Sequence, residues 1–168
     1  MLKFAKGYIR IIEKMNYVLG RFAMYLIFVI MGILLWSSVS KTFFLPSLWT
    51  LETAQFAMVA YYMLGGPYSL QMGSNVRMDL FYGDWSITKK ALVDAFTIFF
   101  LLFYLCVLLY GGYQSTEYAL RYGERSATAW RPYMAPIKIT MCVGIFMMIL
   151  QAVAELFKDI ATVRGVKL

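Results

Sequence analysis

The chain alternates between long uncharged stretches and shorter segments that carry its charged residues. The uncharged stretches run from Phe22 to Ser40, Thr53 to Val76, Ala95 to Thr116 and Ile139 to Ala154. A membrane span needs about 20 mainly apolar residues, because a helix rises about 1.5 Å per residue and the hydrocarbon core is about 30 Å thick. The fourth stretch reaches that length if Lys138 extends its ammonium group to the interface and the helix continues to Phe157. We therefore predict an all-α integral membrane protein with four transmembrane helices, at about 22–40, 53–76, 95–116 and 136–157.

The first 21 residues combine a hydrophobic stripe with basic side chains. The stripe recurs at helical spacing and consists of Phe4, Tyr8, Ile11, Ile12, Met15 and Leu19. Four basic residues lie largely off it: Lys3, Lys6, Arg10 and Lys14. This pattern predicts an amphipathic interfacial helix at 1–21 that lies near anionic lipid headgroups and turns into the first span at Gly20 and Arg21. A simple basic flank of the first span is the alternative.

Composition favours membrane residence over a separate aqueous domain. Hydrophobic residues make up 61% of the 168 residues and charged residues 15%, whereas a soluble domain carries about 25% charged residues. The segments between the predicted spans are too short to fold alone. We therefore expect residues 1–168 to form a single membrane domain.

Basic residues are unevenly divided between the two sides of this predicted topology. The termini and segment 71–94 carry eleven of the 16 Lys and Arg residues. The opposite side carries the other five: Lys41, Arg121, Arg125, Arg131 and Lys138. Because basic segments tend to stay in the cytoplasm, both termini are expected there. The net charge of +7 would suggest nucleic-acid binding in a soluble protein. Here the membrane topology accounts for it, so we expect no nucleic acid as a partner.

Several kinds of functional site are excluded by residues that the chain lacks. It has no histidine, which excludes a bis-histidine haem site, a histidine-based zinc site and a Ser-His-Asp triad. The two cysteines, Cys106 and Cys142, fall in different predicted spans and are interpreted as packing residues. No phosphate-binding glycine loop is present. We therefore expect neither an enzyme nor a resident cofactor or metal.

The acidic residues near membrane depth each have a structural explanation. Two of them, Glu52 and Asp94, lie at the beginnings of predicted helices, where the helix dipole favours a negative charge. The other two precede basic residues at the spacing of helix ion pairs, in Glu117–Arg121 and Glu155–Lys158. A small homo-oligomeric drug exporter would need a charge in the first span, which has none. Ion coupling in this chain is therefore not the preferred interpretation.

The second predicted span, 53–76, is the least uniform. Gly65, Gly66 and Pro67 lie near its middle, where a missing amide and absent side chains predict a kink or a close neighbouring helix. Its last turns carry four polar residues: Ser69, Gln71, Ser74 and Asn75. Because polar side chains are costly against lipid, this end is expected to pack on protein.

Two segments between the spans resemble a known family. Gly73-Ser74-Asn75-Val76-Arg77-Met78-Asp79 is similar to a signature of the small permease subunit of tripartite ATP-independent periplasmic (TRAP) transporters, the DctQ family. Asn75 stands where a histidine is common, so a hydrogen bond is retained there but not an imidazole. The second segment, from Tyr122 to Lys138, resembles the stretch that links the third and fourth helices in that family. The resemblance covers essentially the whole chain.

The resemblance implies a function that composition does not. Members of this family work with a large permease subunit and a periplasmic substrate-binding protein, in the inner membrane of bacterial or archaeal cells, to take up organic acids. The resemblance implies that the sodium and substrate sites lie in the large subunit and that the small subunit is a fixed scaffold. The candidates for the family motif and for subunit packing are Gly65, Gly66, Pro67, Gly73, Asn75, Arg77 and Asp79.

A docking surface for the binding protein is the remaining expectation. Arg121, Arg125 and Arg131 lie with Glu124 on the side where basic residues are disfavoured. They are expected to meet an acidic face of the binding protein, because complementary charge raises the encounter rate and fixes orientation. Pairing with Glu117, Glu124 and lipid headgroups is the alternative. For the chain as a whole, the alternatives are a self-contained four-helix transporter or channel and a structural membrane protein.

Overall fold

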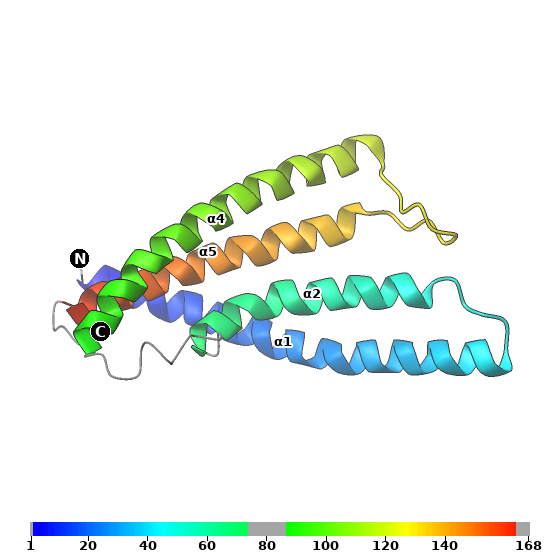
Figure 1. Cartoon of the computed structure of the whole chain (residues 1–168), viewed down its shortest axis with the longest axis horizontal. Coiled ribbons are helices and arrows are strands. Elements are labelled where there is room, and N and C mark those ends of the chain that lie inside the picture. The colour runs from blue at the N-terminus through cyan, green and yellow to red at the C-terminus, as the bar shows by residue number, and fades with distance from the viewer. Residues whose placement is uncertain (1, 74–86, 164–168) are drawn as a thin grey trace.

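The computed structural model describes residues 2–73 and 87–163, and this part of the chain forms long helices that lie side by side. The helices are α1 (Leu2–Phe43), α2 (Thr50–Gln71), α4 (Ile87–Tyr122) and α5 (Ala135–Val163). Figure 1 shows them side by side in the order α4, α5, α2, α1, with α5 and α2 running in one direction and α4 and α1 in the other. α1 begins and α5 ends at one end of the molecule, which we call the terminal end. The connections 44–49 and 123–134 lie at the opposite end, the loop end.

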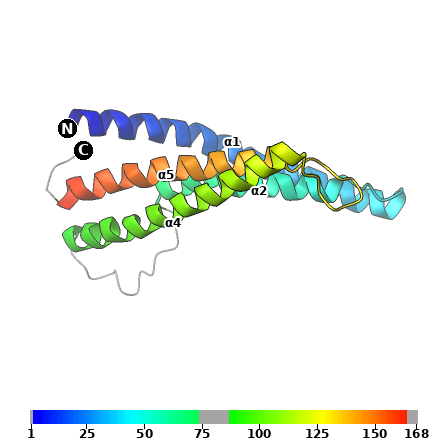
Figure 2. The ribbon, with the colours of Figure 1, turned by 90° about the horizontal axis from the view of Figure 1, so that it is seen from above.

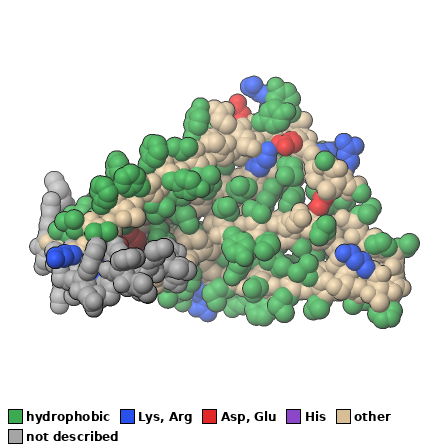
Figure 3. Space-filling view, viewed as in Figure 1, with side chains coloured by type: hydrophobic (Ala, Val, Ile, Leu, Met, Phe, Trp, Pro, Cys, Tyr) green, Lys and Arg blue, Asp and Glu red, His purple; other side chains and the backbone are tan. Residues whose placement is uncertain are grey.

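Three of the described helices are long and apolar enough to cross a membrane, over Lys6–Phe43, Leu92–Tyr122 and Ala135–Val163. They contain the first, third and fourth predicted spans. α2 has 22 residues, about 33 Å at roughly 1.5 Å per residue, so its length suffices but its hydropathy is lower than that of the other three. In Figure 3 hydrophobic side chains cover most of the middle of the molecule, and basic and acidic side chains gather at the loop end.

α1 differs from the prediction because it is one uninterrupted helix. The prediction of a separate helix at 1–21 that turns at Gly20 and Arg21 is wrong, because α1 runs through both residues to Phe43. Gly20 is a contact point instead of a hinge: a Cβ there would lie 2.3 Å from Cγ of Tyr68 in α2. With 42 residues, α1 is about 63 Å long at roughly 1.5 Å per residue, about twice the thickness of a hydrocarbon core.

The predicted hydrophobic stripe of this segment is only partly the packed face. The buried positions follow one another at spacings of three and four: Ile9, Ile12, Asn16, Gly20 and Ala23. Of the predicted stripe, Ile12 is buried, but Ile11 and Met15 are 61% and 45% exposed. The N-terminal part of α1 therefore has two apolar faces, one against the protein and one directed outward.

A close contact between backbones joins α2 to α5. A Cβ on Gly144 of α5 would lie 2.6 Å from the carbonyl oxygen of Met63 in α2. That carbonyl has no intrahelical amide donor, because its partner four residues on is Pro67. An α-hydrogen of Gly144 points toward this oxygen and offers it a weak C–H···O contact. The glycine thus permits two backbones to approach at the point where the proline has removed a hydrogen bond.

The Gly65, Gly66 and Pro67 sequence lies in the last two turns of α2, not in the middle of a span that continues to residue 76. The expected close neighbour is present at Gly66, where a Cβ would lie 2.6 Å from Cε of Met148. Pro67 is fully buried, whereas Gly65 has nothing within 4 Å. Gly66 and Pro67 are therefore used for packing within this chain.

α5 is the central helix of the described part. In its most apolar stretch 39% of the residues are buried, compared with 11% in α1 and 6% in α4. Leu105 of α4 packs with Ile145 and Ala152 of α5 in the hydrophobic core. The remaining large apolar side chains of α1 and α4 are mostly exposed, as expected of helices that meet lipid or another membrane subunit.

The contact between α2 and α5 predicts that Gly144→Ala is destabilising. The new methyl group would meet the backbone of Met63, which cannot rotate away as a side chain does, so the free energy of unfolding should fall by about 2 kcal/mol. Gly111→Ala in α4 is the matched control, because nothing lies within 4 Å of its Cβ position. The melting temperature of the detergent-purified protein should fall only for Gly144→Ala, and equal effects of the two variants would contradict the role assigned to this contact.

Candidate functional site

The loop between α4 and α5, residues 123–134, is held in a compact shape by its own backbone. Gly123 leaves the end of α4 with a φ of 60°, a conformation that glycine adopts without strain. Ser126 N donates a hydrogen bond to Pro132 O over 3.0 Å. Arg125 and Tyr133 form an isolated antiparallel bridge. These contacts give the side chains of the loop defined positions.

Two of the predicted docking residues, Arg125 and Arg131, lie on this loop. The guanidinium carbon of Arg125 lies 4.2 Å from the centre of the Tyr133 ring, and the Arg125 Nη2 donates to the Tyr133 hydroxyl. Arg131 is exposed and has a φ of 50°, which places it at the sharp turn of the loop. Both arginines therefore belong to one exposed structure at the loop end.

The other two predicted docking residues have partners within the chain. Arg121 lies 3.9 Å from Glu117 in an exposed pair one helical turn apart, as the sequence predicted. Glu124 pairs with Lys138 of α5, whose ammonium also donates to Ser115 O over 3.4 Å. Glu124 therefore fixes the loop to α5, and the four predicted residues do not form a single cluster.

A buried carboxylate lies under the same loop. Glu52, in the first turn of α2, is 4% exposed. The Ser126 hydroxyl of the loop lies 3.5 Å from its Oε1, and its Oε2 is buried with no hydrogen-bond partner among the described residues. The helix-dipole position predicted for Glu52 is confirmed. Its contact with the loop could not be predicted, since Ser126 lies 74 residues away.

A group of polar residues at the terminal end, which we call the polar cluster, joins α1 to α5. It consists of Glu13, Asn16, Gln151, Glu155 and Lys158. Asn16 Nδ2 donates to Gln151 Oε1 over 2.6 Å, and Gln151 Nε2 donates to Glu155 Oε1 over 2.8 Å. Lys158 Nζ lies 2.9 Å from Glu155 Oε1 and 2.5 Å from Glu13 Oε1. One ammonium thus bridges two carboxylates on different helices.

Tyr8 and the two buried amides extend this contact. The Tyr8 hydroxyl donates to Leu150 O over 3.1 Å, and its ring meets Phe157 edge to face at 5.9 Å. Asn16 and Gln151 are fully buried. The Glu155–Lys158 pair was predicted, but Glu13 and Asn16 were missed. The sequence held a signal for Asn16, because it lies at helical spacing from Ile9 and Ile12, which are buried.

The family motif after α2 is described only at its first residue. Gly73 has a φ of 62°, and its amide donates to Leu70 O over 3.1 Å, so it terminates the helix as glycine commonly does. The other motif residues, Asn75, Arg77 and Asp79, lie outside the described residues. The predicted packing of the polar end of the second span is seen at Gln71, whose Oε1 is buried.

Neither cysteine forms a disulfide. Cys142 packs near Gly112, and its sulfur lies 3.3 Å from the Thr116 hydroxyl, which fits the predicted packing role. Cys106 is exposed on α4, so the predicted packing role of this cysteine is not seen among the described residues. Within residues 2–73 and 87–163, no group of three or more His, Cys, Asp or Glu side chains is arranged to hold a metal ion.

Comparison with protein families identifies the family of this chain. The family model of the DctQ component of tripartite ATP-independent periplasmic transporters matches residues 30–162. No curated protein matches the chain. The matched region includes most of α5 and all of α2 and α4, together with the loop 123–134. In the polar cluster, Gln151, Glu155 and Lys158 lie inside this region, and Glu13 and Asn16 precede it.

The polar cluster predicts a measurable coupling between Glu13 and Lys158. Lys158→Gln leaves two carboxylates without their shared cation and should lower the free energy of unfolding by about 1 kcal/mol, since the groups are about one third exposed. In a double-mutant cycle with Glu13→Gln, the two effects should not add. Thermal unfolding of the purified full chain measures this. Arg121→Gln, which breaks a more exposed pair, is the control and should change stability less; additive effects at Glu13 and Lys158 would contradict the coupling.

Proposed function

The chain belongs to the DctQ family of TRAP transporters, and from this we propose that it is the small membrane subunit that anchors a large sodium-coupled permease during organic acid uptake. The observation that carries the proposal is the family match over residues 30–162. The described architecture supports it, because three helices are suited to crossing a membrane and the loops between them are too short for an aqueous domain.

We place four spans in the inner membrane, with α2 as the least apolar of them. α2 runs between α1 and α5 and is antiparallel to α1 (Figure 1), so its lower hydropathy is compensated by protein contacts on two sides. The terminal end is assigned to the cytoplasm, because the segments at that end carry eleven of the 16 basic residues. The loop end then faces the periplasm.

A scaffold role fits the way that charge is handled in the described helices. Lys158 is shared by Glu13 and Glu155, and Glu117 is paired with Arg121. Groups that carry ions across a membrane must change partners or protonation state, and such groups are usually found inside a bundle or along a water-filled path. We therefore assign sodium and substrate binding to the large subunit and no cofactor to this chain.

The outward face of α4 is the surface that we assign to the large permease. Tyr110 and Gln114 are exposed there and hydrogen-bonded to each other over 3.1 Å. Gly111 lies beside them with nothing within 4 Å of its Cβ position. Polar side chains and a bare glycine are typical of helix contacts, because lipid cannot satisfy hydrogen bonds and a glycine allows close approach. The outward face of α1 carries large apolar side chains such as Phe28, Val29 and Leu35, and is assigned to lipid.

The loop 123–134 is the surface that we assign to the periplasmic binding protein. It carries Arg125 and Arg131 on a backbone braced by its own hydrogen bonds and by the Glu124–Lys138 pair. Preorganised cations favour fast encounter with an acidic surface. Arg121 adds positive charge nearby, although it is paired with Glu117.

Co-expression with the large permease tests the subunit assignment. The chain should co-purify with the permease, and reconstituted uptake should require both proteins and the binding protein. Gly111→Leu should weaken co-purification by about tenfold, because the new side chain blocks close approach of the partner helix. Gly32→Leu in α1 is the matched control, since its Cβ position is also open. Transport by this chain alone would instead favour a self-contained transporter or channel, and a chain that neither binds a permease nor transports would favour a structural membrane protein.

Charge reversal tests the docking surface. In the complete transporter, Arg125→Glu with Arg131→Glu should slow uptake by about tenfold at low salt, because an acidic partner would then be repelled. The difference should shrink at high salt as the charges are screened. Lys89→Glu at the terminal end of α4 is the control, and its uptake should match that of the unaltered protein. Equal uptake by the double variant at low and high salt would exclude docking through these arginines.

A further inference from the structure

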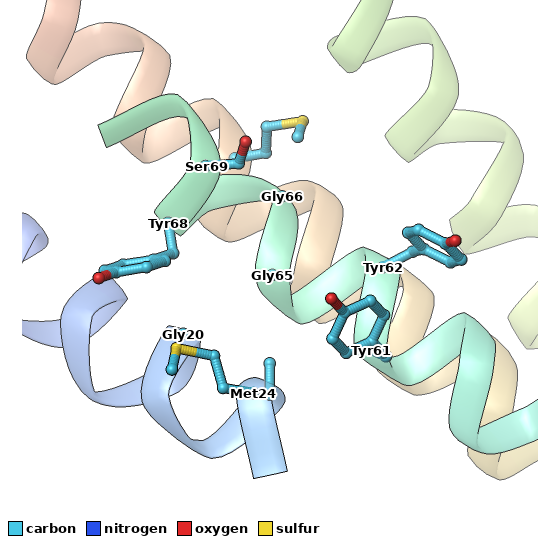
Figure 4. Close-up of a pocket in the computed structure, with 10 residues that line it drawn as sticks. Gly20, Met24, Tyr61, Tyr62, Gly65, Gly66, Tyr68 and Ser69 are labelled. Carbon is cyan, nitrogen blue, oxygen red and sulfur yellow. The ribbon is translucent and has the colours of Figure 1, made fainter. Parts of the chain in front are cut away.

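A groove of about 390 Å³ lies between α1, α2 and α5, beside the middle of α1 and the last turns of α2. Its volume falls in the range of roughly 300–1,000 Å³ that is common for ligand pockets. The lining residues are Gly20, Ala23, Met24, Tyr61, Tyr62, Gly65, Gly66, Tyr68, Ser69 and Met148. Figure 4 shows that Gly65 lies between the Tyr68 end and the Tyr61 end of the groove, opposite Gly20 and Met24 of α1.

The groove is lined by three glycines on facing helices, and only Gly65 is left open. At Gly20 and Gly66 the vacated space is filled by Tyr68 and Met148, whose atoms lie 2.3 Å and 2.6 Å from the missing Cβ positions. At Gly65 nothing in the chain lies within 4 Å of that position. The floor of the groove is therefore open at one residue and closed by packed side chains on either side.

A positive charge lies beside the groove. Arg21 follows Gly20 in α1, and its Nη1 donates to the Tyr17 hydroxyl over 3.1 Å. The Tyr17 ring in turn meets the ring of Tyr68, a lining residue, at 6.0 Å. Arg21 takes part in no ion pair within the described residues. The aromatic contacts thus hold a guanidinium near the groove, and no carboxylate of the described residues is paired with it.

Polarity changes along the length of the groove. Arg21, Tyr68 and Ser69 lie toward the terminal end, where the charge-free stretch of α1 begins. Met24 lies about one turn from Arg21, and Tyr61 lies about two turns from Tyr68, both in the direction of the loop end, where no charged side chain lines the groove. A molecule that fits this order has an anionic group at one end and a hydrocarbon chain at the other, and in a membrane that description belongs to a phospholipid.

We propose that the groove is a binding site for an anionic glycerophospholipid, with the phosphate at Arg21 and one acyl chain over Gly65. A guanidinium forms strong charge-assisted hydrogen bonds with phosphate oxygens. The open face of Gly65 leaves room for the chain where any other side chain would occupy it. The proposal rests on membrane residence and is independent of the transporter assignment.

Native mass spectrometry of the detergent-purified full chain tests this site. Phosphatidylglycerol and phosphatidylcholine with identical acyl chains are added in separate titrations. The unaltered protein should retain phosphatidylglycerol about tenfold more strongly than phosphatidylcholine, a difference of about 1.4 kcal/mol. Gly65→Leu should lower retention of both lipids by about tenfold, because the leucine side chain fills the acyl position. Arg21→Gln should lower phosphatidylglycerol retention and remove its preference over phosphatidylcholine, in which the choline cation already offsets the phosphate charge.

Gly32→Leu is the matched control, because its Cβ position is equally open but lies away from the groove. It should retain both lipids as the unaltered protein does. All variants should have the melting temperature of the unaltered protein. Equal lipid retention by Gly65→Leu and Gly32→Leu would overturn the proposal. If Gly65→Leu instead prevented co-purification with the large permease while lipid retention was unchanged, the groove would be a contact for a partner helix and the lipid site would be rejected.

Discussion

The approach of α5 to α2 at Gly144 and Met63 determines where the other helices lie. No side chain separates the two backbones there, and a Cβ would lie 2.6 Å from the Met63 carbonyl oxygen. α4 packs on one side of this pair through α5, and α1 packs on the other through α2. Gly144 makes this contact possible, and Pro67 makes it favourable, because the proline leaves the Met63 carbonyl without a helical donor. A close contact of this kind replaces the hydrophobic effect, which does not drive helix association inside lipid.

Beyond the end of α2, polar contacts replace glycine packing. α2 ends at Gln71, whereas α1 and α5 continue to the terminal end (Figure 2). There the two helices meet through Tyr8, which contacts Leu150 and Phe157, and through the polar cluster, in which Lys158 joins Glu13 to Glu155. Buried amides such as Asn16 and Gln151 favour one rotation of each helix, because other rotations would leave more of their hydrogen-bonding groups unpaired. These contacts explain why α1 continues as one helix at the position where the sequence predicted a turn.

The sequence predicted helices far better than it predicted their contacts. Charge-free length predicted the three helices that are long and apolar enough to cross a membrane, and the region of α2, since a charged side chain is costly in hydrocarbon whatever its neighbours are. The resemblance of the segments around Gly73 and Arg125 predicted the family that the match to residues 30–162 confirms. The packed faces were harder, because in a membrane the lipid-facing and protein-facing sides of a helix are both apolar. Ile11 and Ile12 are adjacent and equally hydrophobic, yet Ile11 is 61% exposed and Ile12 is 6% exposed.

The contacts missed by the sequence are those that join the described helices at the two ends of the molecule. Asn16 and Gln151 are 135 residues apart in the chain, and Ser126 and Glu52 are 74 apart. These pairs close the terminal end and the loop end, and the Glu124–Lys138 pair ties the loop to the central helix. The surfaces left open are then the outward face of α4, the arginine-bearing loop and the groove over Gly65. A unit that is fixed within itself and open at these places can bind partners without changing its own shape, which is the physical requirement for a stationary subunit beside a moving one.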